Sequence, residues 1–316
     1  MRVAVLGAGT VGAYYGSRLA EGGAEVSLIA RGRHLDALRR DGLTIVEPER
    51  TTTHRFVATD DPADIGTVDL VLFCVKSYDT DAAAGQMDPL LASRTAVLSL
   101  QNGIDNEDRI AAVVGPELVI GGAAYILGAI REPGVVDAAG PRRIVIGELR
   151  PGPPTPRILA IAEVGERAGL RVDAVDDVRV AKWEKYTLLV AFSAMTAAIR
   201  LPIGAIRDSP AAAAMLRTIM TEVWTVGRAS GVPLADDLVE RQMGLLLSQA
   251  ADATTSLYHD LVSGHRMELE ALQGAAIRLG AEAGVPMPAI EAAYAILQPW
   301  AIRNEQPADD RRPISA

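Results

Sequence analysis

Short apolar segments alternate with stretches of helical periodicity along the first half of the chain. Runs of Val, Ile and Leu bounded by glycines or polar residues are typical of buried strands. The predicted strands are 2–6, 25–30, 68–75, 95–100 and 118–121, and the predicted helices include 11–20 and 34–40. Strands that alternate with helices indicate a parallel sheet with helices on its faces. Two smaller runs, 43–46 and 54–58, predict a hairpin at the side of this sheet.

The pattern changes after the last of these strands. Residues 134–148 predict antiparallel strands at the edge of the sheet, because no helical stretch interrupts them. The run Pro151-Gly152-Pro153-Pro154 then breaks the chain before a helix over 158–168 and a final strand over 172–175. Farther along, Ala, Leu, Met and Glu dominate with helical periodicity, so we expect an all-helical second part.

A length of 316 residues also favours two domains, because one hydrophobic core rarely extends over so long a chain. We place the boundary between Val175 and Val180, which gives an α/β domain over 1–176 and a helical domain over 177–304. The polar segment 305–316 contains two prolines and predicts a disordered tail. Long apolar helices at 211–226 and 238–247 fit core packing and a homodimer interface equally well.

Composition excludes several classes of function. The formal net charge is −9 and aromatic residues make up 4%, which argues against nucleic-acid binding by phosphate neutralisation or base stacking. The longest apolar stretches, 118–130 and 188–199, are too short to span a bilayer. A single cysteine, Cys74, cannot form an internal disulfide, and the four histidines lack metal-ligand spacing. We therefore expect a cytoplasmic protein without a metal, a membrane or a nucleic-acid partner.

A glycine motif follows the first predicted strand. Gly7-Ala8-Gly9-Thr10-Val11-Gly12 fits GxGxxG, and it opens a helix that leads to a second strand. Glycines here permit a tight turn, close approach of the backbone to a pyrophosphate, and close packing of helix on strand. The pyrophosphate then lies at a helix N-terminus, where free N–H groups favour anions. The motif and its context predict a Rossmann dinucleotide-binding domain.

The end of the second strand distinguishes the two nicotinamide cofactors. Sites for NAD usually carry an acidic residue there, which accepts hydrogen bonds from the ribose hydroxyls. This chain has Ala30-Arg31-Gly32-Arg33 instead, and a guanidinium pairs well with a 2′-phosphate. Two solvated surface arginines are the alternative interpretation. The missing acid favours NADPH, with Arg31 at the phosphate.

Further motifs resemble those of the ketopantoate reductase (2-dehydropantoate 2-reductase) family, in order over nearly the whole chain. They are Gly7 to Gly16, Ala30-Arg31-Gly32, Val75-Lys76-Ser77, Gln101-Asn102-Gly103, Lys182-Trp183-Glu184-Lys185, Ser256 to Asp260, and Glu268. The resemblance implies a Rossmann domain followed by an all-helical domain. It also implies an oxidoreductase of pantothenate biosynthesis that reduces a small 2-keto acid with NADPH.

The resemblance assigns roles to individual residues. Lys185 is the expected general acid, and Glu268 is expected to orient it or to bind a substrate hydroxyl. Ser256 is expected to hold the substrate carboxylate, and Asn102 and Lys76 to line the nicotinamide ribose or the substrate.

Each role has a structural alternative. Lys185 fits a solvated helix start, although the apolar stretch that follows it carries no charge as far as Ala198. Glu268 fits an exposed helix position, Ser256 fits an N-cap, and Asn102 fits a turn before Gly103.

The chain departs from the family pattern at two positions. Asparagines are expected four and eight residues after the catalytic lysine, on the same helix face. Leu189 and Ser193 stand there instead. Leu189 cannot hydrogen-bond a polar substrate group, so a divergent paralogue acting on a more apolar carbonyl substrate is at least as good an interpretation as ketopantoate itself.

Two other functions share the first domain. A non-catalytic NADP-binding redox sensor needs no acid–base residues, so Lys185 and Glu268 count against it. A 3-hydroxyacid-type dehydrogenase needs an asparagine four residues after its lysine, so Leu189 counts against that assignment.

Overall fold

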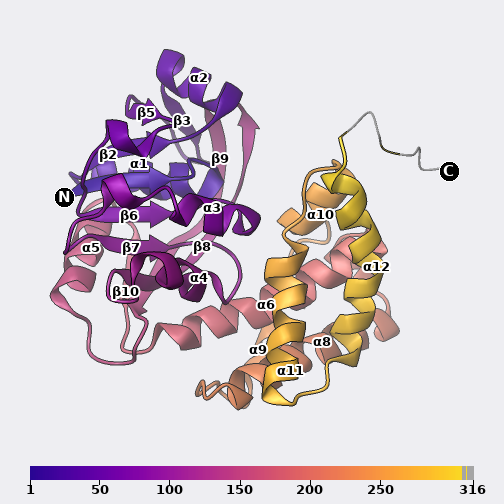
Figure 1. Ribbon diagram of the computed structural model, residues 1–316. Helices are drawn as coiled ribbons and strands as arrows, with labels where there is room; N and C mark the ends of the chain where they lie inside the picture. Colours follow the sequence, from indigo (N-terminus) through magenta and orange to yellow (C-terminus); the bar gives the residue numbers. More distant parts are fainter. Residues whose placement is uncertain (308–310, 312–316) are drawn as a thin grey trace. The chain divides into compact units, whose positions relative to one another are not determined.

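The computed structural model describes residues 1–307 and 311 (Figure 1). The chain divides into two compact units, Met1–Ala181 and Lys182–Ala316, and the division falls within helix α6 (Val178–Ile199). The first unit is α/β and the second contains helices, which confirms the predicted fold class. Helix α12 (Pro288–Glu305) ends where the predicted tail begins, and the prediction of disorder over 308–310 and 312–316 lies outside the described residues.

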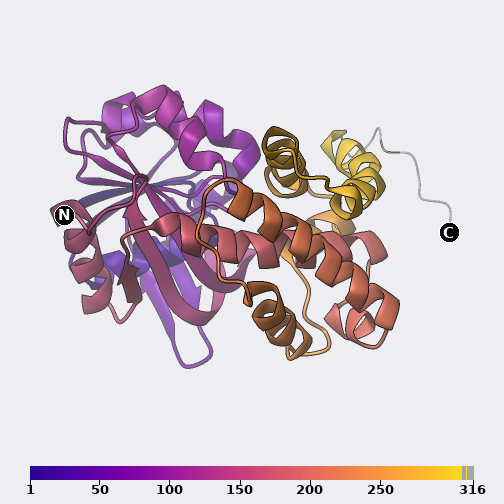
Figure 2. The same ribbon diagram turned by 90° about the horizontal axis from the view of Figure 1, so that it is seen from below.

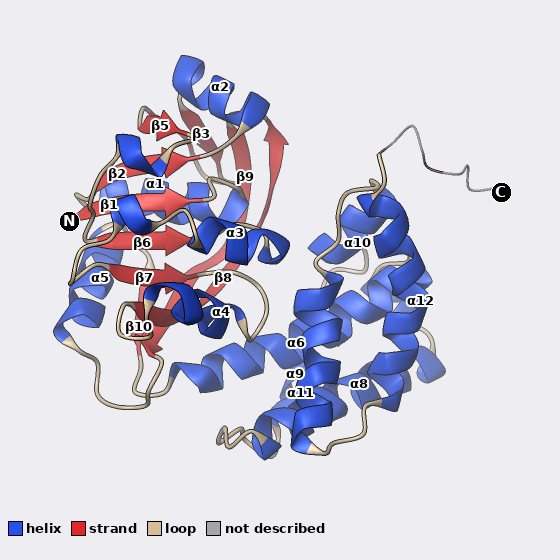
Figure 3. Cartoon of the chain, viewed as in Figure 1, coloured by secondary structure: helices blue, strands red, loops and turns tan. Residues whose placement is uncertain are grey.

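One sheet of ten strands forms the centre of the first unit (Figure 3). The strands are β1 (Arg2–Leu6), β2 (Glu25–Ile29), β3 (Leu43–Val46), β4 (Thr51–His54), β5 (Val57–Thr59), β6 (Leu70–Phe73), β7 (Ala96–Ser99), β8 (Val119–Glu132), β9 (Val135–Glu148) and β10 (Arg171–Ala174). Their order is β4-β3-β9-β8-β7-β6-β1-β2-β5, with β10 also paired to β9. The β3–β4 and β8–β9 pairs are antiparallel, and the other pairs are parallel.

Helices cover both faces of this sheet. The helices of the first unit are α1 (Thr10–Glu21), α2 (Gly32–Asp41), α3 (Thr80–Ala84), α4 (Asn106–Val114) and α5 (Pro156–Arg167). On β1, Val3 and Val5 pack into a core that includes residues of α1 and α5, while Ala4 and Leu6 pack into a second core with residues of α3 and α4. Burial on both faces explains why the parallel strands appear in the sequence as continuous apolar runs.

Three details of the sheet differ from the sequence prediction. The hairpin partner of β3 is β4, not residues 54–58, and β5 within that range pairs with β2 instead. The strands over 134–148 are not at the sheet edge, because β9 lies between β8 on one side and β3 and β10 on the other. Strand β8 also continues to Glu132, well beyond the predicted end at Gly121.

A buried ion-pair cluster joins α1 to the β3–β4 hairpin. Arg18 of α1 donates to Glu47, which also pairs with Arg50 at 3.0 Å and Arg142 at 3.2 Å. The side chains of Arg18 and Glu47 are only 5% and 2% exposed. Arg18 also pairs with Glu21 at 2.7 Å, so removal of the Glu47 carboxylate would leave the buried guanidinium with one carboxylate partner in place of two.

In the second unit, the described residues form helices without strands (Figure 2). After α6 come α7 (Ile203–Arg207), α8 (Pro210–Ala229), α9 (Leu238–Leu247), α10 (Ser256–Val262), α11 (Ala275–Ala283) and α12. Proline occupies the first position of α8 and α12, where its missing N–H has no cost. A π-helical turn, Glu270–Gly274, precedes α11. Among the described residues, no helix has the length and apolarity needed to cross a bilayer.

Candidate functional site

The glycine motif forms the loop between β1 and α1. Gly7 has φ +98°, a conformation that favours glycine, and a Cβ there would lie 2.7 Å from the backbone nitrogen of Val75. A Cβ on Gly12 would overlap the carbonyl oxygen of Gly7 and lie 2.8 Å from Val5 Cγ1. The first and third glycines are therefore required by the packing of the protein itself.

Gly9 differs from the other two glycines. A Cβ built on Gly9 has no atom within 4 Å, so nothing in the described protein requires a glycine there. Gly9 is the N-cap of α1, and no side chain of the described residues caps this helix end. Thr10 and Val11 are the first residues of α1 and are half-buried. Open space beside uncapped N–H groups fits a phosphate, which the loop would hold at the positive end of the helix dipole.

Arg31 follows β2, the parallel neighbour of β1. The last residues of these strands, Leu6 and Ile29, are paired in register, so Arg31 and the glycine loop leave the same edge of the sheet. Arg31 is the exposed N-cap of α2, and its guanidinium donates to Gln86 Oε1 at 3.3 Å. An exposed guanidinium held by one neutral amide fits a partner such as a phosphate.

Lys76 and Asn102 follow β6 and β7 at this same edge. Hydrogen bonds join the two loops: Ser77 Oγ donates to the carbonyl of Asn102 at 3.0 Å, and Gln101 Nε2 donates to the carbonyl of Val75 at 2.9 Å. Asn106 at the start of α4 donates to the Asn102 carbonyl as well. The first unit thus brings the glycine loop, Arg31, Lys76 and Asn102 to the carboxyl ends of four parallel strands, where α/β folds bind ligands.

Lys185 and Glu268 lie on segments of the second unit that are hydrogen-bonded to each other. Lys185 is half-buried on α6, and the next residue, Tyr186, donates from its hydroxyl to the carbonyl of Leu272 at 2.5 Å. Glu268 is 8% exposed and precedes the π-helical turn that contains Leu272. The backbone N–H of Leu272 in turn donates to the carbonyl of Glu268. The predicted acid and its predicted partner therefore lie on neighbouring segments.

The residues in place of the expected asparagines have different surroundings. Leu189 is half-buried one helical turn after Lys185. Ser193 is fully buried; its hydroxyl donates to the carbonyl of Val190 and accepts from Gln273 Nε2 at 2.8 Å. Ser193 therefore packs α6 against the π-helical turn, and its predicted contact with substrate stays a prediction.

The structure corrects the N-cap alternative for Ser256. Thr255 is the N-cap of α10, and its hydroxyl accepts from the backbone N–H of Tyr258. Ser256 is the first residue of the helix and is exposed. Its hydroxyl is therefore not used as the cap.

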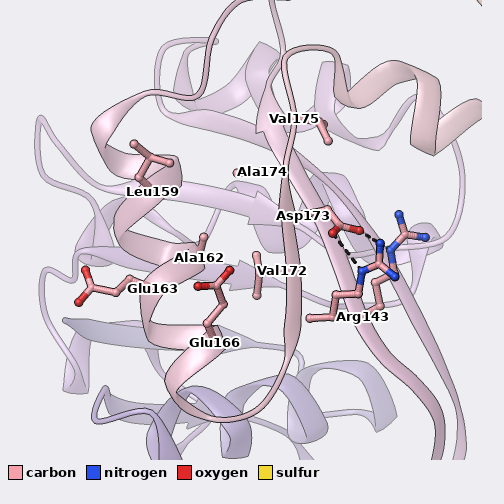
Figure 4. A pocket seen from close by; sticks show the side chains of 10 residues that line it. Arg143, Leu159, Ala162, Glu163, Glu166, Val172, Asp173, Ala174 and Val175 are labelled. Atoms are coloured by element: carbon pink, nitrogen blue, oxygen red, sulfur yellow. Dashed lines mark hydrogen bonds and ion pairs between the residues drawn. The ribbon is translucent and has the colours of Figure 1, made fainter.

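A hollow of about 670 Å³ lies elsewhere on the first unit, between α5 and β10 (Figure 4). In its lining, Asp173 accepts from Arg143 at 2.5 Å and from Arg171 at 3.1 Å. Burial alone would raise the pKa of Asp173, but these hydrogen bonds outweigh it and hold that pKa below its ordinary value. The hollow contains none of the predicted site residues.

Sequence reasoning did not predict the hydrogen bonds that hold these loops. Ser77 and Gln101 lie in two of the motifs that resemble the family, but no local pattern marks their bonds to backbone carbonyls 25 and 26 residues away. Asn106, four residues after its partner Asn102, lies outside those motifs. No sequence pattern predicts the contacts of His34 either, and the four histidines show no metal-ligand spacing. Within the described residues, no group of three or more His, Cys, Asp or Glu side chains could hold a metal ion.

Comparison with known proteins gives one consistent family. Residues 3–151 match the model described as "Ketopantoate reductase PanE/ApbA", and residues 177–301 match "Ketopantoate reductase PanE/ApbA C terminal". A 2-dehydropantoate 2-reductase of Halobacterium salinarum is 34% identical over 92% of this chain and 95% of its own.

Comparison with solved structures gives the same family. The chain is similar to a PanE/ApbA family ketopantoate reductase from Ralstonia eutropha, with 35% identity, a TM-score of 0.89, and coverage of 97% of this chain and 100% of that one. It is also similar to the 2-dehydropantoate 2-reductase from Geobacter metallireducens, with 30% identity, a TM-score of 0.89, and coverage of 95% and 99%. The chain therefore belongs to the ketopantoate reductase family of oxidoreductases, which act on a CH–OH group.

Proposed function

We propose that the protein reduces the carbonyl of a 2-keto acid to the 2-hydroxy acid with NADPH, and that Lys185 is the general acid. The observation that carries this proposal is the open, uncapped glycine loop at Gly9 on the same sheet edge as Arg31. Family membership supports a pyridine-nucleotide-dependent reduction of a 2-keto acid. The preference for the phosphorylated cofactor rests on Arg31.

In this proposal, different residues bind the cofactor and donate the proton. Gly7, Gly9, Thr10, Val11 and Gly12 would hold the pyrophosphate, and bound NADPH would supply a hydride to the carbonyl carbon. The Lys185 ammonium would donate its proton to the carbonyl oxygen, so that the product carries one added hydride and one added proton. Its positive charge would also stabilise negative charge that develops on that oxygen.

The remaining predicted residues support these steps. Glu268, on the segment bonded to the residue after Lys185, is suited to orient the ammonium or to accept from a substrate hydroxyl. Lys76 and Asn102 would line the nicotinamide ribose or the substrate. The exposed Ser256 would donate to the substrate carboxylate.

Leu189 favours a substrate with an apolar substituent. One turn after Lys185, its side chain offers no hydrogen bond, so a hydroxyl placed beside it would lose its water without a new partner. An alkyl or aryl group would gain from the same contact. We therefore extend the proposal to 2-keto acids with an apolar side chain, alongside ketopantoate.

The test is oxidation of NADPH followed by its absorbance, with ketopantoate and a panel of apolar 2-keto acids. Lys185→Ala should lower kcat at least a hundredfold, within the usual range for a general acid. Lys182→Ala, three residues earlier on the same helix, removes a more buried lysine and is the control: assayed below its thermal midpoint, it should retain turnover. NADPH binding without turnover of any keto acid would instead favour a redox sensor, and equal loss in both variants would contradict the role of Lys185.

The proposal includes a cytoplasmic location and a homodimer, to be checked by cell fractionation and by size-exclusion chromatography with light scattering.

A further inference from the structure

His34 makes two hydrogen bonds that connect three separate segments of the first unit. It lies on α2, the helix that begins directly after Arg31. Its Nε2 is 2.9 Å from the carbonyl oxygen of Ala8, within the glycine motif, and its Nδ1 is 3.2 Å from the backbone nitrogen of Gly134, in the turn between β8 and β9.

The chemistry of these partners fixes the protonation of the ring. A backbone N–H can only donate, so Nδ1 must accept the proton of Gly134 and carry none itself. A carbonyl can only accept, so Nε2 must carry the proton and donate to Ala8. His34 is therefore the neutral Nε2–H tautomer. Burial lowers the pKa of His34, which favours the same neutral form.

The Ala8 carbonyl belongs to the peptide group that also contains the N–H of Gly9. Because a peptide group is planar and trans, a carbonyl held in one direction holds the N–H that follows it in the opposite direction. The hydrogen bond from His34 thus sets the direction of the Gly9 N–H. Gly9 is the position where the protein leaves open space at the end of α1.

Gly134, the partner of His34 Nδ1, is itself held in place. The carbonyl of Gly134 accepts from the backbone N–H of Thr44 at 2.8 Å, so the turn is tied to β3. Nearby on β8, a Cβ built on Gly128 would lie 2.9 Å from Thr10 Cγ2, so this ribbon also packs closely on the first residue of α1. His34 can therefore hold the loop against a rigid support.

We propose that His34 is a positioning residue for the cofactor: it orients the Gly9 peptide so that its N–H faces the pyrophosphate, and it ties the glycine loop to the helix that carries Arg31. This inference rests on the proposed binding of NADPH. It assigns to His34 an effect on cofactor affinity that is separate from folding.

Two substitutions separate the two hydrogen bonds. His34→Gln places an amide NH₂ near the position of Nε2 and keeps the donor to Ala8. His34→Asn places an amide oxygen near the position of Nδ1 and keeps the acceptor for Gly134, but loses the donor to Ala8. His54→Asn, at the other half-buried histidine of this unit, is a matched control.

The experiment measures the dissociation constant of NADPH by fluorescence titration, and the thermal midpoint of each variant without cofactor. His34→Asn should weaken NADPH binding roughly three- to tenfold, as expected for one lost hydrogen bond. His34→Gln and His54→Asn should stay within about twofold of the wild type, a margin well below the effect of one hydrogen bond.

Other results would overturn the inference. If both His34 variants bind NADPH like the wild type, or if both lose the same affinity and the same thermal stability, the residue has only a structural role. If the wild type itself binds no NADPH, the proposed function fails together with this inference. NADPH binding by the wild type with no difference between the variants refutes the role of His34 alone.

Discussion

Replacement of Gly9 by alanine should separate cofactor binding from folding. Gly9 has φ −70° and ψ −169°, a conformation that alanine adopts without strain. Its Cβ would meet no atom of the protein within 4 Å. Alanine is a poorer N-cap than glycine by up to about 1 kcal/mol, and the reduced freedom of the unfolded chain restores about 0.4–1 kcal/mol. We therefore expect a nearly unchanged free energy of unfolding.

Gly12→Ala is the contrasting variant. Its Cβ would overlap the carbonyl oxygen of Gly7 and crowd Val5. Overpacking of this kind costs about 1–3 kcal/mol, and the better helix propensity of alanine returns about 0.5–1 kcal/mol. The net loss of up to about 2.5 kcal/mol should lower the midpoint of thermal unfolding by several degrees, at about 2–4 °C per kcal/mol.

The assay compares thermal unfolding with fluorescence titration of NADPH. Gly9→Ala should unfold like the wild type but bind NADPH roughly tenfold more weakly or worse, because its methyl group occupies the space beside the phosphate-binding N–H groups. Gly12→Ala should lose thermal stability. If Gly9→Ala binds NADPH with wild-type affinity, the glycine loop does not hold the pyrophosphate. If that variant unfolds at a lower temperature, the space around Gly9 is not open as described.

Three further predictions concern charge. Arg31→Ala should weaken NADPH binding about tenfold or more and change NADH binding little, because only NADPH loses a charge-assisted hydrogen bond. Parallel titrations with the two cofactors measure this difference. An equal loss of affinity for both cofactors would count against the contact of Arg31 with the 2′-phosphate. Glu47→Gln should lower the free energy of unfolding by about 1.5–3 kcal/mol in urea titrations, because the buried Arg18 loses one charged hydrogen bond and keeps the one to Glu21. A change below about 0.5 kcal/mol would contradict that reasoning. The lowered pKa of His34 means that the unfolded chain takes up a proton first as the pH falls below about 6.5. Stability should therefore be greatest above that pH and decline below it, and His34→Gln should show a shallower decline in unfolding measured across that range.

The sheet was largely predictable from the sequence because burial on two faces leaves continuous apolar runs. Strand β4 was not, since Thr51–His54 carries no apolar run and is recognisable only by its pairing with β3. The outer half of β8 was missed for a related reason. The apolar stretch continues to Ile130, but residues 127–130 are exposed and include Gly and Ala, so the run does not reveal where the buried strand ends.

The candidate site was predictable where chemistry depends on residue type at fixed spacing. The glycine motif and Arg31 are of this kind, and the structure brings them to one edge of the sheet. The cap of α10 was not, because two adjacent hydroxyls at Thr255 and Ser256 are equivalent in sequence. The extended backbone of Thr255, with φ −120° and ψ 164°, makes it the N-cap. His34 was missed because both of its partners are backbone groups.

The π-helical turn Glu270–Gly274 changes how the neighbourhood of Glu268 can be compared between proteins. A π turn behaves as a single residue inserted into an α-helix, and one residue corresponds to a rotation of about 100°. A helical wheel continued backwards from α11 would therefore assign residues before the turn to the wrong side. Deletion of one residue within the turn should restore α-helical winding and rotate the preceding segment by the same angle. Because Glu268 lies two residues before this turn, the winding of the turn helps to set the direction in which its carboxylate leaves the backbone.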